Sequence, residues 1–322
     1  MTYSIVARDP ITGHLGVGVE THQPAVGAIV PWVKAGVGAV ATQSFANIHF
    51  GPRSLALLES GLSAEQTLAA ILAADTMAEL RQVSVLAADG TSATHTGSRC
   101  IPFAGHIQGE DFSAQANMMT RPGVPEAMAA AFAATEGPLP LRILAALDAA
   151  QAAGGDIRGQ QSAAILVRGP GPLDYTWDLR VDNSRAPLED LRTLVNMRLA
   201  AHVLPEEGMT GSYDEAIAAF HRARELDPTD EPIFWFALGR LVELGRLDEA
   251  AALLRPLFER APQWEELPRR LELPGARQMR EPLELWAGQL DRPPVDLEHL
   301  RGDCLRPELP HAFQSRLGNP RT

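Results

Sequence analysis

The order of elements is set by the opening stretch TYSIVARDPITGHLGVGVE, which covers Thr2–Glu20. Within it, Tyr3–Arg8 and Leu15–Glu20 are rich in the β-branched and aromatic residues that favour extended strands. Asp9–Gly13 lies between them and has the composition of a turn, because proline presets φ and glycine accepts positive φ. The sequence therefore predicts an antiparallel hairpin at its start.

Strand and helix patterns continue from this hairpin to about residue 185, in blocks rather than in alternation. The sequence predicts four strands, two helices, three strands, two helices and two strands. A parallel sheet needs strict alternation of strand and helix, whereas this order suits antiparallel sheets packed face to face with helix pairs outside. The further predicted strands are Val26–Pro31, Val37–Ser44, Gln82–Ala88, Thr91–Thr96, Phe112–Met119, Gln161–Arg168 and Tyr175–Val181. The predicted helices are Pro52–Ser60, Ala64–Ala74, Pro125–Thr135 and Pro140–Ala153.

From Pro187 onwards the pattern is helical. Residues 211–228 align with residues 245–262, so that the prolines ending the two segments are 34 positions apart. This period is typical of tetratricopeptide repeats, whose helix pairs bury their apolar faces by stacking on neighbours. We predict a first domain over residues 1–186, a helical domain over residues 187–290 and a Pro- and Arg-rich tail over residues 291–322.

Composition and charge exclude several classes of function. The 322 residues are 45% hydrophobic and 21% charged, which is typical of a globular protein with a full core. A net charge of -12 provides no basic face for nucleic acid or for an anionic membrane. We see no signal peptide and no apolar run of about 18 residues, so we expect a cytoplasmic protein without a membrane partner. The cysteines and histidines lack metal-ligand spacing and no nucleotide-binding glycine motif is present, so we expect no metal and no cofactor.

Eight stretches of the first domain resemble a known bacterial family. They are Tyr3–Pro10, Val30–Trp32, Gly36–Gln43, Phe50–Arg53, Gly61–Ser63, His95–Gly97, Ala114–Asn117 and Gly154–Ala164. The family is number 1028 in the catalogue of domains of unknown function, and its fold is similar to that of the N-terminal-nucleophile (Ntn) hydrolases. The resemblance implies an α+β protein whose first domain is a four-layer αββα sandwich. Here a small all-α, tetratricopeptide-like domain follows it.

The similarity to Ntn hydrolases implies a nucleophile at the start of the chain. In these enzymes one residue attacks with its side chain, and its free α-amine, with an unperturbed pKa of about 7.7–8.0, takes up the proton. Thr2 fits this role once Met1 is removed. Related threonine hydrolases tune the nucleophile with a lysine on an early strand, a role open to Lys34, the only lysine of the sequence. The alternatives are an ordinary strand threonine at Thr2 and an exposed turn lysine at Lys34.

A dense polar segment, GGDIRGQQS at residues 154–162, follows the last predicted helix of the first domain. We interpret Asp156, Arg158, Gln161 and Ser162 as groups that position the substrate or the nucleophile. An Arg held by an Asp presents a fixed fork of donors to a carboxylate or an amide. The alternative is a glycine helix cap followed by an ordinary surface ion pair.

Further polar candidates lie at or near the ends of predicted strands. They are Thr42, Gln43, Asn47, His95 and Asn117. Amide side chains at such positions can donate to a developing oxyanion or bind substrate, and a histidine can act as a base. The alternative for each of them is a structural hydrogen bond within a turn or hairpin.

Together these residues favour an amidohydrolase that cleaves an amide or peptide-like bond in a small substrate through an acyl-enzyme on Thr2. The rival hypothesis is a non-catalytic ligand-binding or assembly protein, with an inactive hydrolase-like sandwich and a helical tail that docks a partner. In a third hypothesis the tail mainly builds a homodimer.

Overall fold

The computed structural model of the chain describes residues 2–171, 176–203, 212–264 and 267. Contacts along the backbone divide the chain into two compact units, Met1–Val195 and Asn196–Thr322. The tail predicted over residues 291–322 lies outside the described residues, as does Tyr175 at the start of the last predicted strand.

The predicted hairpin is confirmed. Strand β1 (Thr2–Arg8) pairs with β2 (Leu15–Thr21), so that Thr2 lies opposite Thr21. The Asp9 carboxylate closes the turn by accepting hydrogen bonds from the Ile11 N–H and the Thr12 hydroxyl. Nearly every residue of both strands is buried, which means that the hairpin is covered on both faces.

Ten strands form two antiparallel sheets among the described residues. The larger has the order β10-β9-β2-β1-β8-β7, and the smaller has the order β3-β4-β5-β6. The other strands of the larger sheet are β7 (Gly105–Gly109), β8 (Phe112–Asn117), β9 (Ser162–Arg168) and β10 (Trp177–Val181). Those of the smaller sheet are β3 (Pro31–Lys34), β4 (Gly38–Ser44), β5 (Arg81–Ala87) and β6 (Ser92–Thr96). The predicted antiparallel pairing is therefore confirmed.

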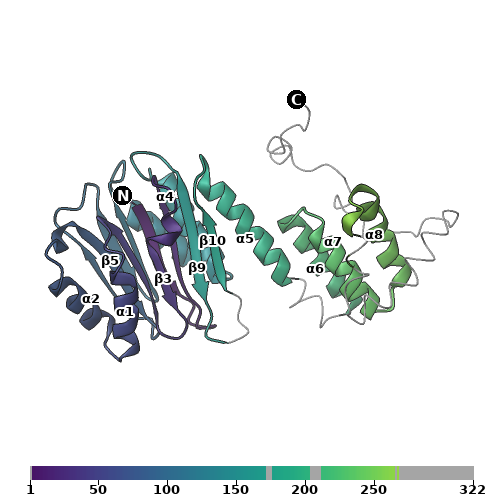
Figure 1. Cartoon of the computed structure of the whole chain (residues 1–322), viewed down its shortest axis with the longest axis horizontal. Helices are drawn as coiled ribbons and strands as arrows, with labels where there is room; N and C mark the ends of the chain where they lie inside the picture. Colours follow the sequence, from purple (N-terminus) through teal and green to yellow (C-terminus); the bar gives the residue numbers. More distant parts are fainter. Residues whose placement is uncertain (1, 172–175, 204–211, 265–266, 268–322) are drawn as a thin grey trace. The chain divides into compact units, whose positions relative to one another are not determined.

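The two sheets pack against each other, and a helix pair packs on the outer face of each (Figure 1). Helices α1 (Phe50–Glu59) and α2 (Ala64–Ala73) cover the smaller sheet, whereas α3 (Val124–Ala134) and α4 (Leu139–Ala152) cover the larger one. Ser63 caps α2 in the capping box with Gln66 that the sequence predicts. Part of the layer between the sheets is apolar, with Val17 and Val19 of β2 in the same cluster as Ala39 and Ala41 of β4.

Two strands of the first unit differ from those predicted. The strand predicted over Val26–Pro31 is wrong: Val26–Ala28 form a short 3-10 turn, η1, and β3 begins only at Pro31. The Val26 N–H donates to the Ser162 hydroxyl at 3.2 Å instead of joining a strand ladder. Strand β7 was not predicted, because its sequence GHIQG lacks apolar alternation and it pairs only with β8 at a sheet edge.

Helix α4 lies close to β2 because two residues of that strand have no side chain. A Cβ atom on Gly18 would lie 2.2 Å from the Ile143 Cγ2 atom and 3.3 Å from the Leu147 Cδ1 atom of α4. Gly16 is similarly crowded by Ile143. The Gly-Val alternation of β2 thus sets how closely this helix approaches the larger sheet.

The second unit contains the helices of the predicted repeat. Helix α5 (Pro187–Val203) spans the boundary between the units, and α6 (Tyr213–Leu226), α7 (Glu231–Trp235) and α8 (Leu247–Arg260) follow. Helices α6 and α8 begin 34 residues apart, as the repeat period requires. A π-helical segment, Phe236–Leu241, continues α7 and was not predicted. Phe220 and Phe236 stack with ring centroids 4.4 Å apart in a shared core. Among the helices that the structure describes, none has the length and apolarity needed to cross a bilayer.

Replacing Gly18 with alanine is expected to lower the free energy of unfolding by about 1–3 kcal/mol, because the new methyl group would push α4 away from β2. Gly105→Ala is the matched control, since nothing lies within 4 Å of the Cβ position of Gly105. Denaturant unfolding of both variants measures the difference. Equal destabilisation would contradict the close helix–strand contact.

Candidate functional site

Thr2 lies between the two sheets rather than at the surface. Its side chain shares the face of β1 that carries Ser4, because alternate strand residues point the same way. Thr2 is 4% exposed, and its hydroxyl donates to the Thr21 hydroxyl at 3.1 Å. Its backbone carbonyl accepts hydrogen bonds from Gln43 Nε2 at 3.0 Å and from Asn117 Nδ2 at 3.4 Å. Two of the predicted site residues therefore lie directly beside Thr2.

Gln82 of β5 ties these two amides together. Its Oε1 atom accepts from Gln43 Nε2 at 2.7 Å and from Asn117 Nδ2 at 2.9 Å. Its own Nε2 atom donates to the Ala116 carbonyl at 2.9 Å. Because all three amides are buried, each depends on the others for its hydrogen bonds. The Gln43 and Asn117 donors are already engaged, so contact with an oxyanion would require these bonds to rearrange.

The same polar layer extends along β1 and β8. The Ser4 hydroxyl donates to Gln43 Oε1 at 2.7 Å and accepts from Gln115 Nε2 at 3.2 Å. Gln115 also donates to the Ala41 carbonyl of the smaller sheet at 3.1 Å. Side chains from both sheets thus hold the layer together. We call the residues of this layer the inter-sheet network; they are Thr2, Ser4, Gln43, Gln82, Gln115 and Asn117.

The segment between α4 and β9 borders the same end of the larger sheet. Gly154 and Gly155 end α4 with positive φ angles of 126° and 57°. The Asp156 carboxylate then accepts from the Arg158 N–H at 2.9 Å, from its guanidinium at 2.7 Å and from the His22 N–H at 3.2 Å. The Asp156 side chain is fully buried, whereas that of Arg158 is 28% exposed. Asp156 therefore holds a partly exposed guanidinium in place.

The other two residues of this segment have structural partners. Ser162 lies opposite Thr21, next to the Thr2–Thr21 pair. Its hydroxyl donates to the Gln23 carbonyl and accepts from the Val26 N–H, both in the turn that follows β2. Gln161 lies beside it, and its Nε2 atom donates to Asn183 Oδ1 at 3.0 Å.

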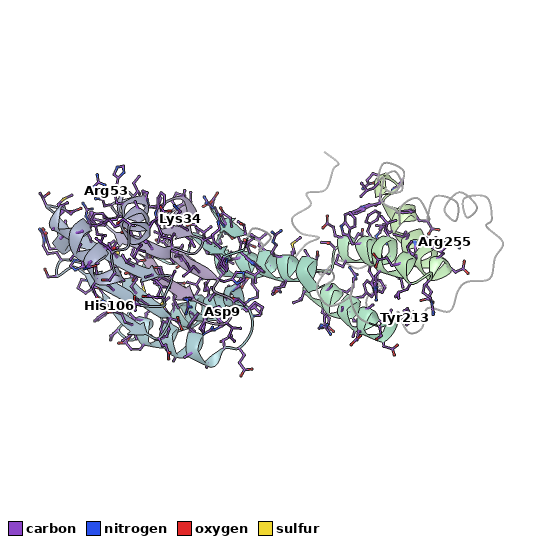
Figure 2. The ribbon with its side chains drawn as sticks, turned by 90° about the horizontal axis from the view of Figure 1, so that it is seen from below. Asp9, Lys34, Arg53, His106, Tyr213 and Arg255 are labelled. Atoms are coloured by element: carbon purple, nitrogen blue, oxygen red, sulfur yellow. The ribbon has the colours of Figure 1, made fainter. Side chains whose placement is uncertain are left out.

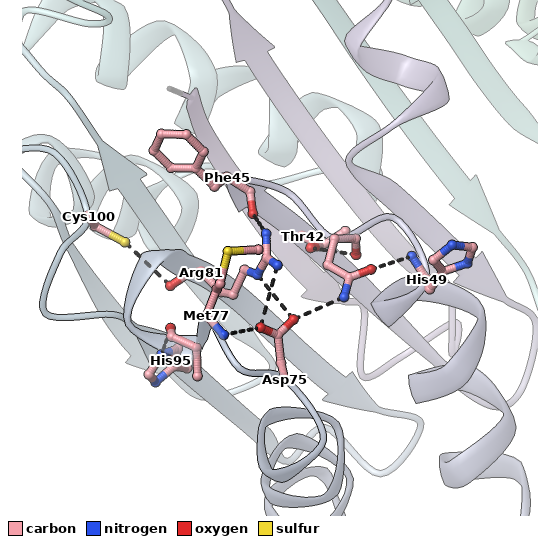
Figure 3. Close-up of polar contacts among 10 residues, drawn as sticks. Thr42, Phe45, His49, Asp75, Met77, Arg81, His95 and Cys100 are labelled. Atoms are coloured by element: carbon pink, nitrogen blue, oxygen red, sulfur yellow. Dashed lines mark hydrogen bonds and ion pairs between the residues drawn. The ribbon is translucent and has the colours of Figure 1, made fainter.

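Thr42, Asn47 and His95 do not join Thr2. Thr42 neighbours Gln43 on β4 and points to the opposite face, where its hydroxyl donates to the Asn47 carbonyl at 3.2 Å (Figure 3). A ring nitrogen of His95 lies 2.8 Å from the Ala78 carbonyl, on the same outer face. The structure therefore does not bring these three residues together with Thr2.

Lys34 is also distant from Thr2. Strand β3 runs from Pro31, opposite Ala41, to Lys34, opposite Gly38, and so away from the end where Gln43 meets Thr2. The Lys34 ammonium instead forms an exposed ion pair with Glu59 of α1, at 2.5 Å. The structure therefore does not bring Lys34 to Thr2, and its position fits the alternative of an exposed lysine.

An ion pair that the sequence analysis missed lies beneath the loop after β4 (Figure 3). Arg81 Nε donates to Asp75 Oδ2 at 3.2 Å, and Asn47 Nδ2 donates to the same oxygen at 3.0 Å. Burial alone would raise the pKa of Asp75, but hydrogen bonds from Asn47 and the Met77 N–H, together with Arg81, hold it below its usual value. The Arg81 guanidinium also donates to the Phe45 carbonyl. This ion pair fixes the loop that follows Gln43.

A second missed residue is Glu20, on the face of β2 opposite to Thr21. It is fully buried opposite Tyr3, whose hydroxyl donates to Gln151 of α4 at 3.0 Å. Neither Glu20 oxygen has a hydrogen-bond partner of normal geometry among the described residues. Burial raises the pKa of Glu20 to about 8, opposed by the nearby Tyr3 hydroxyl and reinforced by the charge of Asp156. A charged residue at the end of an otherwise apolar strand was the available signal.

Within the described ranges, no three His, Cys, Asp or Glu side chains gather where a metal ion could bind. Cys100 is a buried free thiol whose sulfur lies 3.4 Å from the Arg81 carbonyl.

Glu20→Gln is expected to stabilise the protein in a pH-dependent way. The unfolded chain releases this proton near pH 4.5, whereas the folded chain holds it to about pH 8. The folded state therefore binds more protons in that window, and stability falls as the pH rises through it, by on the order of 5 kcal/mol. The variant does not lose this stability, so the difference in free energy of unfolding between the variant and the wild type should grow from pH 4.5 to pH 8. Unfolding of both proteins across this range tests it, with exposed Glu136→Gln as the control. A pH-independent difference would contradict the raised pKa.

Comparisons with known proteins agree with the two-part organisation. Residues 2–191 match the family of unknown function DUF1028, and residues 209–271 match a tetratricopeptide repeat family. A crystal structure of a DUF1028-family protein from Silicibacter pomeroyi is 29% identical to this chain, with a TM-score of 0.57. The match covers 67% of this chain and 92% of that one. No curated protein matches the sequence. Because the family match spans more than half of the residues, the chain belongs to the DUF1028 family.

Proposed function

We propose that this protein is an Ntn-type amidohydrolase that cleaves an amide or peptide-like bond in a small substrate, with Thr2 as the nucleophile. The observation that carries the proposal is the position of Thr2: it heads a central strand, between two facing sheets, with its hydroxyl in a polar layer. The antiparallel sheets with outer helix pairs support a four-layer αββα sandwich of the Ntn type.

The chemistry requires Thr2 to be the first residue of the working protein. Its α-amine then accepts the proton of the Thr2 hydroxyl while the oxygen attacks the substrate carbonyl carbon. The tetrahedral intermediate collapses to an ester on Thr2, and the amine leaves with the transferred proton. Water attacks the ester, the carboxylic acid departs, and the Thr2 hydroxyl is restored. The Thr21 hydroxyl, which accepts from the Thr2 hydroxyl, orients the nucleophile.

Two groups of neighbours would assist this reaction. The Asn117 and Gln43 amides are the nearest donors for an oxyanion, provided that they turn from the Thr2 carbonyl toward the substrate. Arg158 is positioned by Asp156 and is partly exposed, which suits it to bind a carboxylate or amide of the substrate. Gln161 and Ser162 position the strand start beside Thr21.

A non-catalytic binding protein is the rival, and one observation favours it. The Thr2 hydroxyl and carbonyl both have hydrogen-bond partners within the protein, as a purely structural threonine would. In that case the inter-sheet network serves to hold the sheets together.

The purified protein is expected to lack the mass of Met1 and to carry no N-terminal acetyl group, because the mechanism needs a free threonine amine. A threonine-directed β-lactone should add one label per chain to the wild type and none to Thr2→Ala. Exposed Thr12→Ala should label as the wild type does. Intact-mass spectrometry measures all three. Retained Met1, or labelling that survives in Thr2→Ala, would sink the hydrolase proposal.

We also propose that the helical unit docks a partner protein, with a second copy of this chain as the simplest candidate, because the repeat family it matches stacks helix pairs on neighbours. A chain that ends at Val203 keeps α5 and loses α6 to α8. Its oligomeric state, measured by light scattering, is expected to fall from dimer to monomer. An unchanged oligomeric state would show that the helical unit does not build the dimer.

A further inference from the structure

Exposed apolar side chains gather at one end of the first unit. Six large hydrophobic residues are highly exposed among its described residues: Ile11, Phe45, Ile48, Met77, Phe103 and Ile157. Ile11, at 94% exposure, lies in the β1–β2 turn. The other five lie on loops at the opposite end, where Thr2 begins β1. Several exposed apolar side chains at one end of a folded unit point to a binding site more than a single one does.

The strand register places these loops at the same end. Thr2 lies opposite both Asn117, the last residue of β8, and Thr21, which lies opposite Ser162 at the start of β9. Ser44 ends β4 opposite Arg81, the first residue of β5. The Gln43–Thr2 hydrogen bond joins these ends of the two sheets. The loops that follow β4 and β8, and those that precede β5 and β9, therefore all extend beyond Thr2.

Three of the five apolar residues are tied closely to the amides beside Thr2. Phe45 is the second residue after Gln43, and its carbonyl accepts from Arg81. The Phe103 carbonyl accepts from the Met119 N–H at 3.3 Å, and the Ile157 N–H donates to the Met118 carbonyl at 3.2 Å. We call Phe45, Phe103 and Ile157 the apolar rim; their exposures are 56%, 47% and 58%.

The backbone bends sharply between the amides and the rim. Ser44 and Met118, which directly follow Gln43 and Asn117, have φ angles of 67° and 59°. Non-glycine residues rarely adopt this left-handed conformation, and it persists where the surrounding structure enforces it, often beside a functional site. Each bend turns the chain out of its strand immediately after a donor that reaches Thr2.

Several guanidinium groups at this end could bind an anionic group of a ligand. Three carboxylates near this end are paired with arginines: Asp75 with Arg81, Glu79 with Arg99 and Asp156 with Arg158. Two exposed carboxylates, Asp182 after β10 and Glu126 in the first turn of α3, lie at the same end. Two further arginines have no carboxylate partner in the part of the chain that the structure describes. Arg53 is exposed at the start of α1 (Figure 2), and the exposed Arg121 donates to the Ala152 and Ala153 carbonyls. The exposed guanidinium of Arg53 and the partly exposed one of Arg158 can each donate hydrogen bonds to a carboxylate.

We propose that the apolar rim binds the apolar acyl group of an N-acylated amino acid, whose carboxylate lies toward the arginines and whose amide carbon faces Thr2. This inference rests on the proposed hydrolase function and names its substrate class. Cleavage transfers the acyl group to the Thr2 oxygen and releases the amino acid with the proton; water then yields a free carboxylic acid and restores Thr2. An apolar acyl group adds binding energy with each methylene that it buries.

The test uses the full-length chain and a series of N-acylglycines from acetyl to octanoyl. Calorimetric binding to Thr2→Ala separates recognition from cleavage, and amine release by the wild type measures cleavage. Affinity is expected to rise by about threefold to fourfold per methylene until the rim is covered. Adding Phe103→Ser should weaken octanoylglycine binding about tenfold and leave acetylglycine unchanged. Ile11→Ser, at the other end, is the matched control and should change neither.

Each alternative gives a different result. Affinity that is independent of acyl length, or an equal loss in Ile11→Ser, would overturn the inference. So would a change of oligomeric mass in Phe103→Ser, because the rim would then be a contact between copies. Equal binding of octanoylglycine and its uncharged amide, octanoylglycinamide, would overturn the carboxylate assignment. Length-dependent binding without amine release would support the rim and reject the hydrolase. Amine release with no length preference would support the hydrolase and reject the rim.

Discussion

Three side-chain amides from three strands join the two sheets at the Thr2 carbonyl. Gln43 and Asn117 donate to that carbonyl, and Gln82 accepts from both of them. All three are buried, where an unpaired polar group costs about 1–3 kcal/mol. Their mutual dependence therefore fixes the separation of the sheets at this end and the conformation of the first residue of β1. The apolar part of the layer, around Val17 and Val19, supplies packing but no comparable directional constraint.

The two faces of the β1–β2 hairpin carry different chemistry. Thr2, Ser4 and Thr21 face the smaller sheet and form hydrogen bonds with side chains of the polar layer. Glu20 and Tyr3 face α4, where the carboxyl group is held in a site that favours its neutral form. Burying such a group costs stability when it ionises. The hairpin face with Glu20 and Tyr3 thus tolerates close packing of α4. The face with Thr2 and Ser4 supplies hydrogen-bond donors and acceptors beside the proposed nucleophile.

The sequence predicted the hairpin, the antiparallel order and the helical repeat, because each depends on local periodicity. It could not predict which side chains would come into contact in the folded protein. Alternation along β4 meant that only one of Thr42 and Gln43 could face Thr2, but the choice depends on pairing with β5 and on the facing sheet. Strand β7 escaped prediction because edge pairing with β8, rather than its own sequence, holds it extended. The Asp75–Arg81 pair and Glu20 likewise required the tertiary structure, since burial gives them their roles.

The left-handed bends at Ser44 and Met118 separate two tasks along the chain. Residues before each bend are locked by strand pairing. After Ser44 the side chain of Phe45 is exposed, whereas after Met118 the buried Met119 precedes the exposed residues 120–123. Loop composition at this end is consequently free to diverge without displacing the amides around Thr2. Substitutions at a few exposed loop positions would therefore change which ligand the protein prefers, without altering the residues around Thr2.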